Sequence, residues 1–186
     1  MELIPTLEIG WLNGWIPLAV LVLVEGLLLK VFPKEVVARL FDRSGWGKKQ
    51  VVFTVIGKLF SLACLVLIVF TPLKVGSTAF IVGAVLYVLG LAGLVMAILN
   101  FRNTPVGQPV TRGLYTVSRH PQIVMLFVMF LGMCLAIGSW LAVLALLMSR
   151  LLQHFGILAE EEVCLAQYGD SYQNYMKRVP RYFLFF

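Results

Sequence analysis

Two clusters of polar residues in this chain have side chains suited to a binding or catalytic site. The first lies in "RGLYTVSRHPQIVMLFVMF", residues 112–130, where Arg119, His120 and Pro121 stand directly before a long apolar run. Proline disfavours helix at the preceding residue and is favoured at the first helical position, so a helix is predicted to begin at Pro121. Free backbone amides at that start would stabilise an anionic group of a ligand beside His120.

The second cluster is Glu160, Glu161 and Glu162, which follow the last long apolar run. Arginine and histidine suit a carboxylate, and a glutamate suits hydroxyl groups or an ammonium group. Each cluster also has a simpler explanation. The glutamates can mark the first solvated turn of a helix, and a basic pair can contact lipid headgroups. Single motifs often match by chance, so the site hypothesis depends on the two clusters lying together.

The elements that must position these clusters are membrane helices. Of the 186 residues, 60% are hydrophobic and 13% charged, and the mean hydropathy is +0.93. A soluble core of this size cannot bury so much apolar surface. We predict an all-α polytopic membrane protein with about five transmembrane helices, the last two a tight helical hairpin, and a C-terminal helix outside the lipid. The predicted spans are 11–32, 51–73, 75–99, 123–138 and 139–158.

The basic residues predict the orientation of these helices. The net charge is +6, but the charges fall in the loops between apolar runs, a pattern that indicates membrane topology and not nucleic-acid binding. We therefore expect the N-terminus outside and the C-terminus and site in the cytoplasm. The loop "KVFPKEVVARLFDRSGWGKK", residues 30–49, is predicted to hold this topology and to contact anionic lipid. The three cysteines have no metal or disulfide spacing and are predicted to be packing residues.

The stretches "PVTRGLYTVSRHPQ" and "EEEVCLAQYGDSYQNYMKRVPR", separated by a helical hairpin, resemble the integral-membrane methyltransferases, which include the isoprenylcysteine carboxyl methyltransferases and the phospholipid N-methyltransferases. The resemblance covers residues 100–182. We predict one membrane-embedded domain over 1–186, with N-terminal helices in 1–99 and a cofactor-binding half in 100–186. The resemblance implies an S-adenosyl-L-methionine site built from Gln108, Pro109, Val110, Tyr115, Arg119, His120, Pro121, Glu160 and Glu161.

The chain departs from the family pattern at several positions. Ile123 and Met125 stand where the family usually has a tyrosine and a glycine, and Gly156 stands where the isoprenylcysteine enzymes carry an arginine for the acceptor carboxyl group. Arg150 and His154 lie one helical turn apart on the same face of the last span. We therefore hypothesise that this pair approaches the acceptor, against the alternative that both side chains extend to the membrane surface.

The sequence does not decide the identity of the methyl acceptor. It can be a lipophilic or small thiol, amine or carboxyl compound, and the membrane can be a bacterial inner membrane or an endoplasmic reticulum. The alternative function is an NADPH-dependent reductase related to the membrane sterol reductases, and a non-catalytic scaffold is a third. Tyr168, Tyr172 and Tyr175 share one helix face and are predicted to pack at the bilayer interface and to cover the cofactor.

Overall fold

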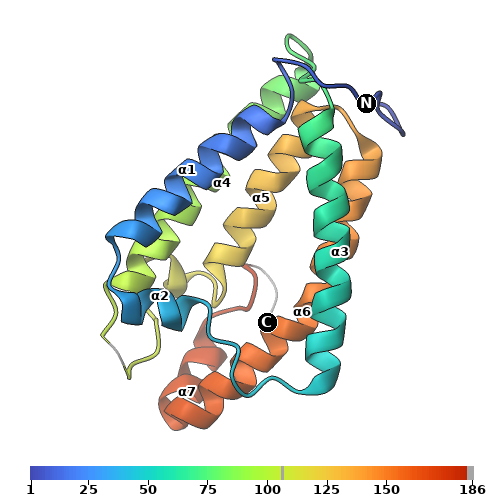
Figure 1. The fold of residues 1–186 in the computed structure, drawn as a ribbon. Helices are drawn as coiled ribbons and strands as arrows, with labels where there is room; N and C mark the ends of the chain where they lie inside the picture. Colours follow the sequence, from blue (N-terminus) through green and yellow to red (C-terminus); the bar gives the residue numbers. More distant parts are fainter. Residues whose placement is uncertain (106, 184–186) are drawn as a thin grey trace.

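The computed structural model describes residues 1–105 and 107–183, and within them the secondary structure is helical apart from isolated bridges (Figure 1). The short helices are α2 (Lys34–Leu40), the 3-10 turn η1 (Gly113–Thr116) and α7 (Asp170–Arg178). The long helices are α1 (Trp15–Val31), α3 (Lys48–Phe70), α4 (Thr78–Arg102), α5 (Pro121–Ala136) and α6 (Trp140–Tyr168). The predicted all-α fold class is confirmed.

Three of these helices, α3, α4 and α6, are long and apolar enough to cross a membrane, and α5 is a shorter apolar helix of 16 residues. The apolar helix α1 has 17 residues. The chain is therefore a polytopic membrane protein. The largest difference from the predicted boundaries is at α6, which continues ten residues beyond the expected end, to Tyr168. This extension carries the three glutamates on regular helix.

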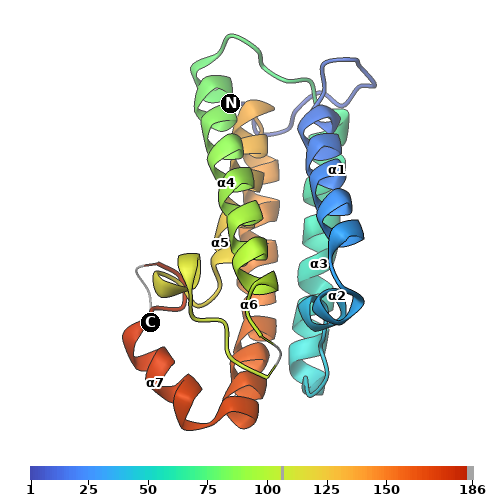
Figure 2. The ribbon, with the colours of Figure 1, turned by 90° about the vertical axis from the view of Figure 1, so that its left-hand side faces the viewer.

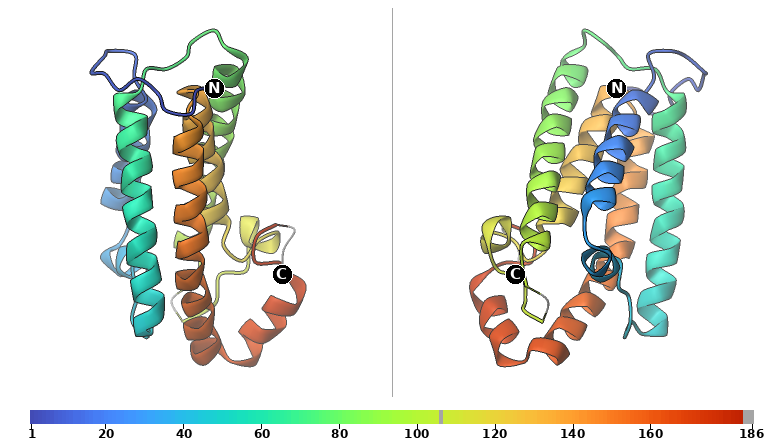
Figure 3. Two further views of the ribbon diagram at one scale, coloured as in Figure 1. Left: turned by 90° about the vertical axis from the view of Figure 1, so that its right-hand side faces the viewer. Right: turned by 60° about the vertical axis from the view of Figure 1, so that its left-hand side comes forward.

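The last two long helices are joined by the short turn 137–139, as predicted, but their main packing partners are other helices. Helix α5 packs chiefly against α4, and α6 packs chiefly against α3, which runs beside it in Figure 3. Glycine permits the close α4–α5 contact, because a Cβ at Gly83 or Gly132 would collide with backbone atoms of the facing helix. The hairpin is thus tight in its connection, and each of its helices belongs to a different pair.

The two ends of the bundle differ in character. One end holds the N-terminus, the α3–α4 loop and the α5–α6 turn, while α2, the 103–120 segment, η1 and α7 gather at the other end (Figures 1 and 2). The basic loops predicted to share a compartment therefore lie at the same end. Both polar clusters identified from the sequence lie there too. We call residues 103–120 the site loop.

Candidate active site

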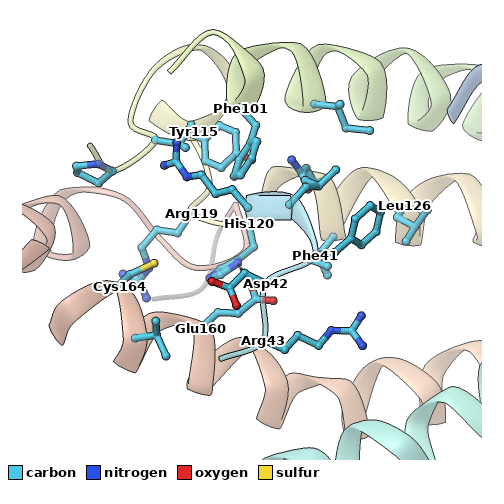
Figure 4. Close-up of a pocket in the computed structure, with 18 of the residues that line it drawn as sticks. Phe41, Asp42, Arg43, Phe101, Tyr115, Arg119, His120, Leu126, Glu160 and Cys164 are labelled. Carbon is cyan, nitrogen blue, oxygen red and sulfur yellow. Dashed lines mark ion pairs between the residues drawn. The ribbon is translucent and has the colours of Figure 1, made fainter. Parts of the chain in front are cut away.

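A cavity of about 470 Å³ opens at this end of the bundle (Figure 4). Its volume lies in the range of about 300–1,000 Å³ that is usual for ligand pockets. Its walls come from α1, the α2–α3 connection, α4, the site loop, α5, α6 and α7. The predicted site residues that line it are Pro109, Val110, Tyr115, Arg119, His120, Arg150 and Glu160. The two sequence clusters therefore meet at one cavity.

The site loop is held in place from both sides. Asn100, near the end of α4, accepts a hydrogen bond through Oδ1 from the Leu114 amide at 2.9 Å. Arg39 of α2 donates to the Gln108 carbonyl at 2.7 Å and stacks over Phe101, with its guanidinium carbon 4.9 Å from the ring centre. These contacts fix a loop that has only one turn of helix of its own.

A buried ion pair joins the site loop to α6. Arg119 donates through Nε to Glu161 Oε1 at 2.8 Å, and only 3% and 5% of these two side chains are exposed. Arg119 also donates through Nη1 to the carbonyls of Met176 and Val179, at 2.9 and 3.0 Å. One side chain thus ties together the start of α5, the middle of α6 and the end of α7. Arg119 and Glu161 position the site.

The opposite oxygen of Glu161 binds the segment that follows α7, residues 179–183, which we call the C-terminal strap. Arg181 donates to Glu161 Oε2 through Nη2 at 2.7 Å and through Nε at 3.0 Å. This bond to the carboxylate raises the pKa of Arg181. Two further hydrogen bonds fasten the strap: the Arg119 amide donates to the Pro180 carbonyl, and the Ser118 hydroxyl donates to the Arg181 carbonyl.

His120 and Glu160 face the cavity. His120 Nε2 lies 3.2 Å from Glu161 Oε1, and because a carboxylate only accepts, this ring nitrogen carries the proton. The other ring nitrogen, Nδ1, lies 3.7 Å from Glu160 Oε2. The Glu160 side chain is 43% exposed, unlike that of Glu161. Of the two adjacent glutamates, Glu160 is therefore the one available to a ligand.

Three tyrosines from the site loop and α7 form another wall of the cavity. Tyr115, Tyr172 and Tyr175 are all buried and line the cavity, and the Tyr175 hydroxyl donates to the Tyr115 carbonyl at 2.7 Å. Burial raises the pKa of each of these phenols, so they stay neutral at physiological pH. The prediction that Tyr172 and Tyr175 pack at the bilayer interface is wrong, because α7 folds back against the site loop and encloses them.

Four predicted site residues do not line this cavity. Gln108 faces a shallow hollow on the outside of the site loop, beside Tyr168 and Ser171. Pro121 is buried at the first position of α5, where it starts the helix as predicted.

The other two residues hold the site together. Glu161 is buried in the ion-pair cluster, and His154 binds the C-terminal strap. The His154 Nδ1 atom lies 2.7 Å from the Tyr182 hydroxyl. Burial raises the pKa of Tyr182 to about 12, so this hydroxyl keeps its proton.

The cavity also has wall residues that sequence reasoning assigns to another role. Phe41, Asp42, Arg43, Ser44 and Trp46 line it, although the loop that carries them was assigned to topology and lipid contact. Sequence reasoning also missed Arg181, which binds Glu161. The one signal in the sequence is the turn "DRSGWG", in which an aromatic residue stands between two glycines. That turn is too common a pattern to indicate a site without the tertiary contact.

The comparison with protein families concerns the part of the chain that holds the site loop, α5 and α6. The model of the phospholipid methyltransferase family matches residues 100–171. The protein-S-isoprenylcysteine O-methyltransferase of Schizosaccharomyces pombe is 38% identical over 74 residues. That alignment covers 38% of this chain and 30% of the yeast protein, so the chain matches under a third of that relative's length. No solved structure shows a significant match.

Proposed function

We propose that the protein is an S-adenosyl-L-methionine-dependent methyltransferase acting on a lipophilic acceptor at the membrane, from the premise that residues 100–171 match the model of the phospholipid methyltransferase family. One observation carries the proposal. The site loop and Glu160 of α6, which are far apart in the sequence, line one part of a single cavity, which we call its mouth, and the apolar residues Leu28, Leu94 and Leu126 line another part, which we call its inner arm. A polar donor and an apolar acceptor would need these two environments side by side.

The residues at the mouth fit the methyl donor. The half-exposed Glu160 carboxylate can accept from ribose hydroxyls or from an ammonium group, and His120 together with the Gln122 amide at the start of α5 can receive a carboxylate. Bound there, the cofactor supplies an electrophilic methyl group on a sulfonium centre. Arg119 and Glu161 hold His120 and the strap in place, and the buried tyrosines exclude water from the cavity.

The chain's part in catalysis is then positioning and desolvation. Methyl transfer is an in-line displacement, so the protein has to hold donor and acceptor at near-attack distance. A dry cavity strengthens the electrostatic interactions of the reacting groups. We place the basic end of the bundle in the cytoplasm, where a water-soluble cofactor reaches the mouth directly, while a lipophilic acceptor reaches the inner arm between the helices. His154 and Arg150 are our candidates for contact with the acceptor.

Calorimetry on the purified full chain in detergent tests the proposal. We expect S-adenosylhomocysteine to bind and NADPH not to bind. The matched pair Glu160→Gln and Glu162→Gln supplies the control, because Glu162 is the exposed neighbour outside the cavity. Only Glu160→Gln should weaken binding. Binding of NADPH alone would instead support a reductase, and binding of neither compound by the wild-type protein would refute an enzyme of either kind.

A radiolabel transfer assay then addresses the acceptor. The protein is incubated with S-adenosylmethionine carrying a labelled methyl group and with amphiphiles that present a thiol, an amine or a carboxylate. Label extracted into the organic phase identifies the nucleophile that this cavity accepts. A protein that binds S-adenosylhomocysteine but labels none of these classes would contradict the proposed lipophilic acceptor.

A further inference from the structure

Residues 1–14, which we call the N-terminal segment, present an apolar surface that is not part of any helix. The segment lies at the end of the bundle far from α7 and from the cavity mouth (Figure 2). Its exposed apolar side chains are Met1, Leu3, Ile4, Leu7, Ile9, Trp11 and Leu12. Ile9 is 92% exposed and Trp11 is 89% exposed. A contiguous apolar surface of this kind marks contact with a protein or with a membrane.

The most exposed part of the segment, residues 9–12, is held in a fixed turn that we call the apolar tip. Asn13 is buried, and its side-chain amide donates to the Glu8 carbonyl at 2.7 Å. On the other side, Trp15 donates through Nε1 to the Gly10 carbonyl at 3.1 Å. The two hydrogen bonds close the turn around the tip, so its apolar side chains stay directed away from the bundle.

The length of α3 places the N-terminal segment at one surface of the bilayer. The Glu8 amide donates to the carbonyl of Phe70, the last residue of α3, at 2.8 Å. Helix α3 has 23 residues and begins with Lys48 and Lys49, and at 1.5 Å per residue it is about 35 Å long. The hydrocarbon core of a bilayer is about 30 Å thick. With the two lysines among the headgroups of one leaflet, the segment lies among the headgroups of the other.

The backbone of the segment fits this depth. The amides of Glu2, Glu8 and Gly14 donate to carbonyls of the neighbouring connections. Those of Leu7 and Ile9 have no hydrogen-bond partner among the described residues. An unpaired amide is costly within the hydrocarbon, whereas water and headgroup oxygens satisfy it at the interface. The segment therefore suits the boundary between headgroups and acyl chains and not the middle of the bilayer.

The apolar surface continues from the segment onto the ends of the helices. Val75 of the α3–α4 loop, Ile81 of α4, and Trp140 and Leu144 of α6 are all exposed at this end. Such a surface, which extends over several helices, fits a bilayer that surrounds the bundle better than a single protein partner on one side. Trp11 and Trp140 also belong to the residue type that is favoured at membrane interfaces.

The charges at this end select the kind of lipid. In the described connections here, Lys74 is the one basic side chain, and its Nζ atom lies 3.0 Å from Glu2 Oε1. Glu8 is exposed. An anionic lipid surface is held by clusters of lysine and arginine, and this end offers it one cation that is already paired. Zwitterionic lipid carries no net charge, so it covers the apolar tip without this repulsion.

We propose that the N-terminal segment is a lipid-binding surface whose apolar tip inserts into the interface of a zwitterionic leaflet, on the side of the membrane opposite the cavity mouth. Apolar burial and interfacial tryptophan supply the binding, and charge attraction does not. The surface lies outside the candidate active site, so this inference does not depend on the proposed function.

Fluorescence of the full chain in phosphatidylcholine vesicles tests the inference. Trp11→Phe removes one of the four tryptophans, so the difference between wild-type and variant emission isolates Trp11. Lipid brominated near the headgroup should quench this emission about twofold more strongly than lipid brominated near the chain ends. Iodide on both sides of the membrane should quench it less than it quenches free tryptophan. Added phosphatidylglycerol should not strengthen the quenching by brominated lipid.

Ile9→Asn and Val117→Asn form the matched control pair, because each replaces an exposed aliphatic side chain and Val117 lies in the site loop at the other end. Only Ile9→Asn should weaken quenching of Trp11 by brominated lipid and strengthen quenching by iodide. Circular dichroism reports that each variant is folded. Absence of quenching by any brominated lipid would show that protein, such as a second copy of the chain, covers the tip. That result overturns the inference, as does quenching by iodide equal to that of free tryptophan or stronger insertion into phosphatidylglycerol.

Discussion

Arg119 Nε lies 2.8 Å from Glu161 Oε1, although 42 residues and two apolar helices separate these side chains in the sequence. The pair is almost completely buried, and His120 and Arg181 share the same carboxylate. Three positively polarised groups around one glutamate fix the start of α5, the C-terminal strap and α6 relative to each other. The mouth of the cavity depends on this arrangement.

The two adjacent glutamates should respond differently to the same substitution. Glu161→Gln leaves the buried Arg119 without its counter-charge, and we expect a loss of about 3–5 kcal/mol in the free energy of unfolding. Glu160→Gln changes a half-exposed side chain, so unfolding should stay near the wild-type value while S-adenosylhomocysteine binding weakens. Titration with denaturing detergent measures the first quantity and calorimetry the second. Equal destabilisation by both variants would contradict the different roles assigned to them.

His154 and Tyr182 should act as a unit. Removing either partner of their 2.7 Å hydrogen bond, with His154→Gln or Tyr182→Phe, breaks the same contact between α6 and the strap. Each single change should cost about 1 kcal/mol of stability, and the double variant little more than either single one. Turnover measured on the same four proteins checks whether His154 also contacts the acceptor. Additive losses of stability would show that the two side chains act independently.

Alkaline pH should destabilise the protein in a defined window. Burial raises the pKa of Tyr182 from 10.0 to about 12. Below about pH 10 the phenol is neutral in both folded and unfolded chains, and its contribution to stability is fully present. Between about pH 10 and 12 only the unfolded chain releases the proton, so the free energy of unfolding falls. The buried Tyr115, Tyr172 and Tyr175 shift in the same direction.

This prediction is checked by the slope of stability against pH from 8 to 12. Tyr182→Phe removes one of the titrating groups, so its slope above pH 10 should be shallower than that of the wild-type protein. An identical slope for the two proteins would mean that the environment of Tyr182 in the folded chain is not the buried one described here.

Gly156 should tolerate no side chain. Because an added Cβ meets Trp46 and Thr54, we expect Gly156→Ala to cost about 1–3 kcal/mol of unfolding free energy through overpacking. A second change, Trp46→Leu in the Gly156→Ala background, should recover part of this loss by making room. Gly156→Ala at an unchanged free energy of unfolding would contradict the close approach of the α3 segment to α6.

Sequence patterns predicted the fold class and several residues that line the cavity because these depend on local properties. Long apolar runs identify membrane helices, and Pro121 marks the start of α5. The predicted span 139–158 ends ten residues before α6 does, since hydropathy reports where the lipid environment ends and not where the helix ends. A short C-terminal helix was predicted to carry Tyr168, Tyr172 and Tyr175 on one face, but Gly169 separates Tyr168, the last residue of α6, from α7. Tyr172 and Tyr175 turn inward because the strap and site loop fold over them.

The sequence by itself determined that polar residues of two distant segments lie at one end of a bundle of apolar helices. Only the tertiary structure decided which of those residues face the cavity and which form the contacts that hold its walls in place. Glu160 and Glu161 are adjacent and chemically identical, so no local pattern separates their roles. The two side chains point in different directions from α6. Long-range packing places Arg119 and Arg181 beside Glu161, which gives Glu161 a structural role and leaves Glu160 for a ligand.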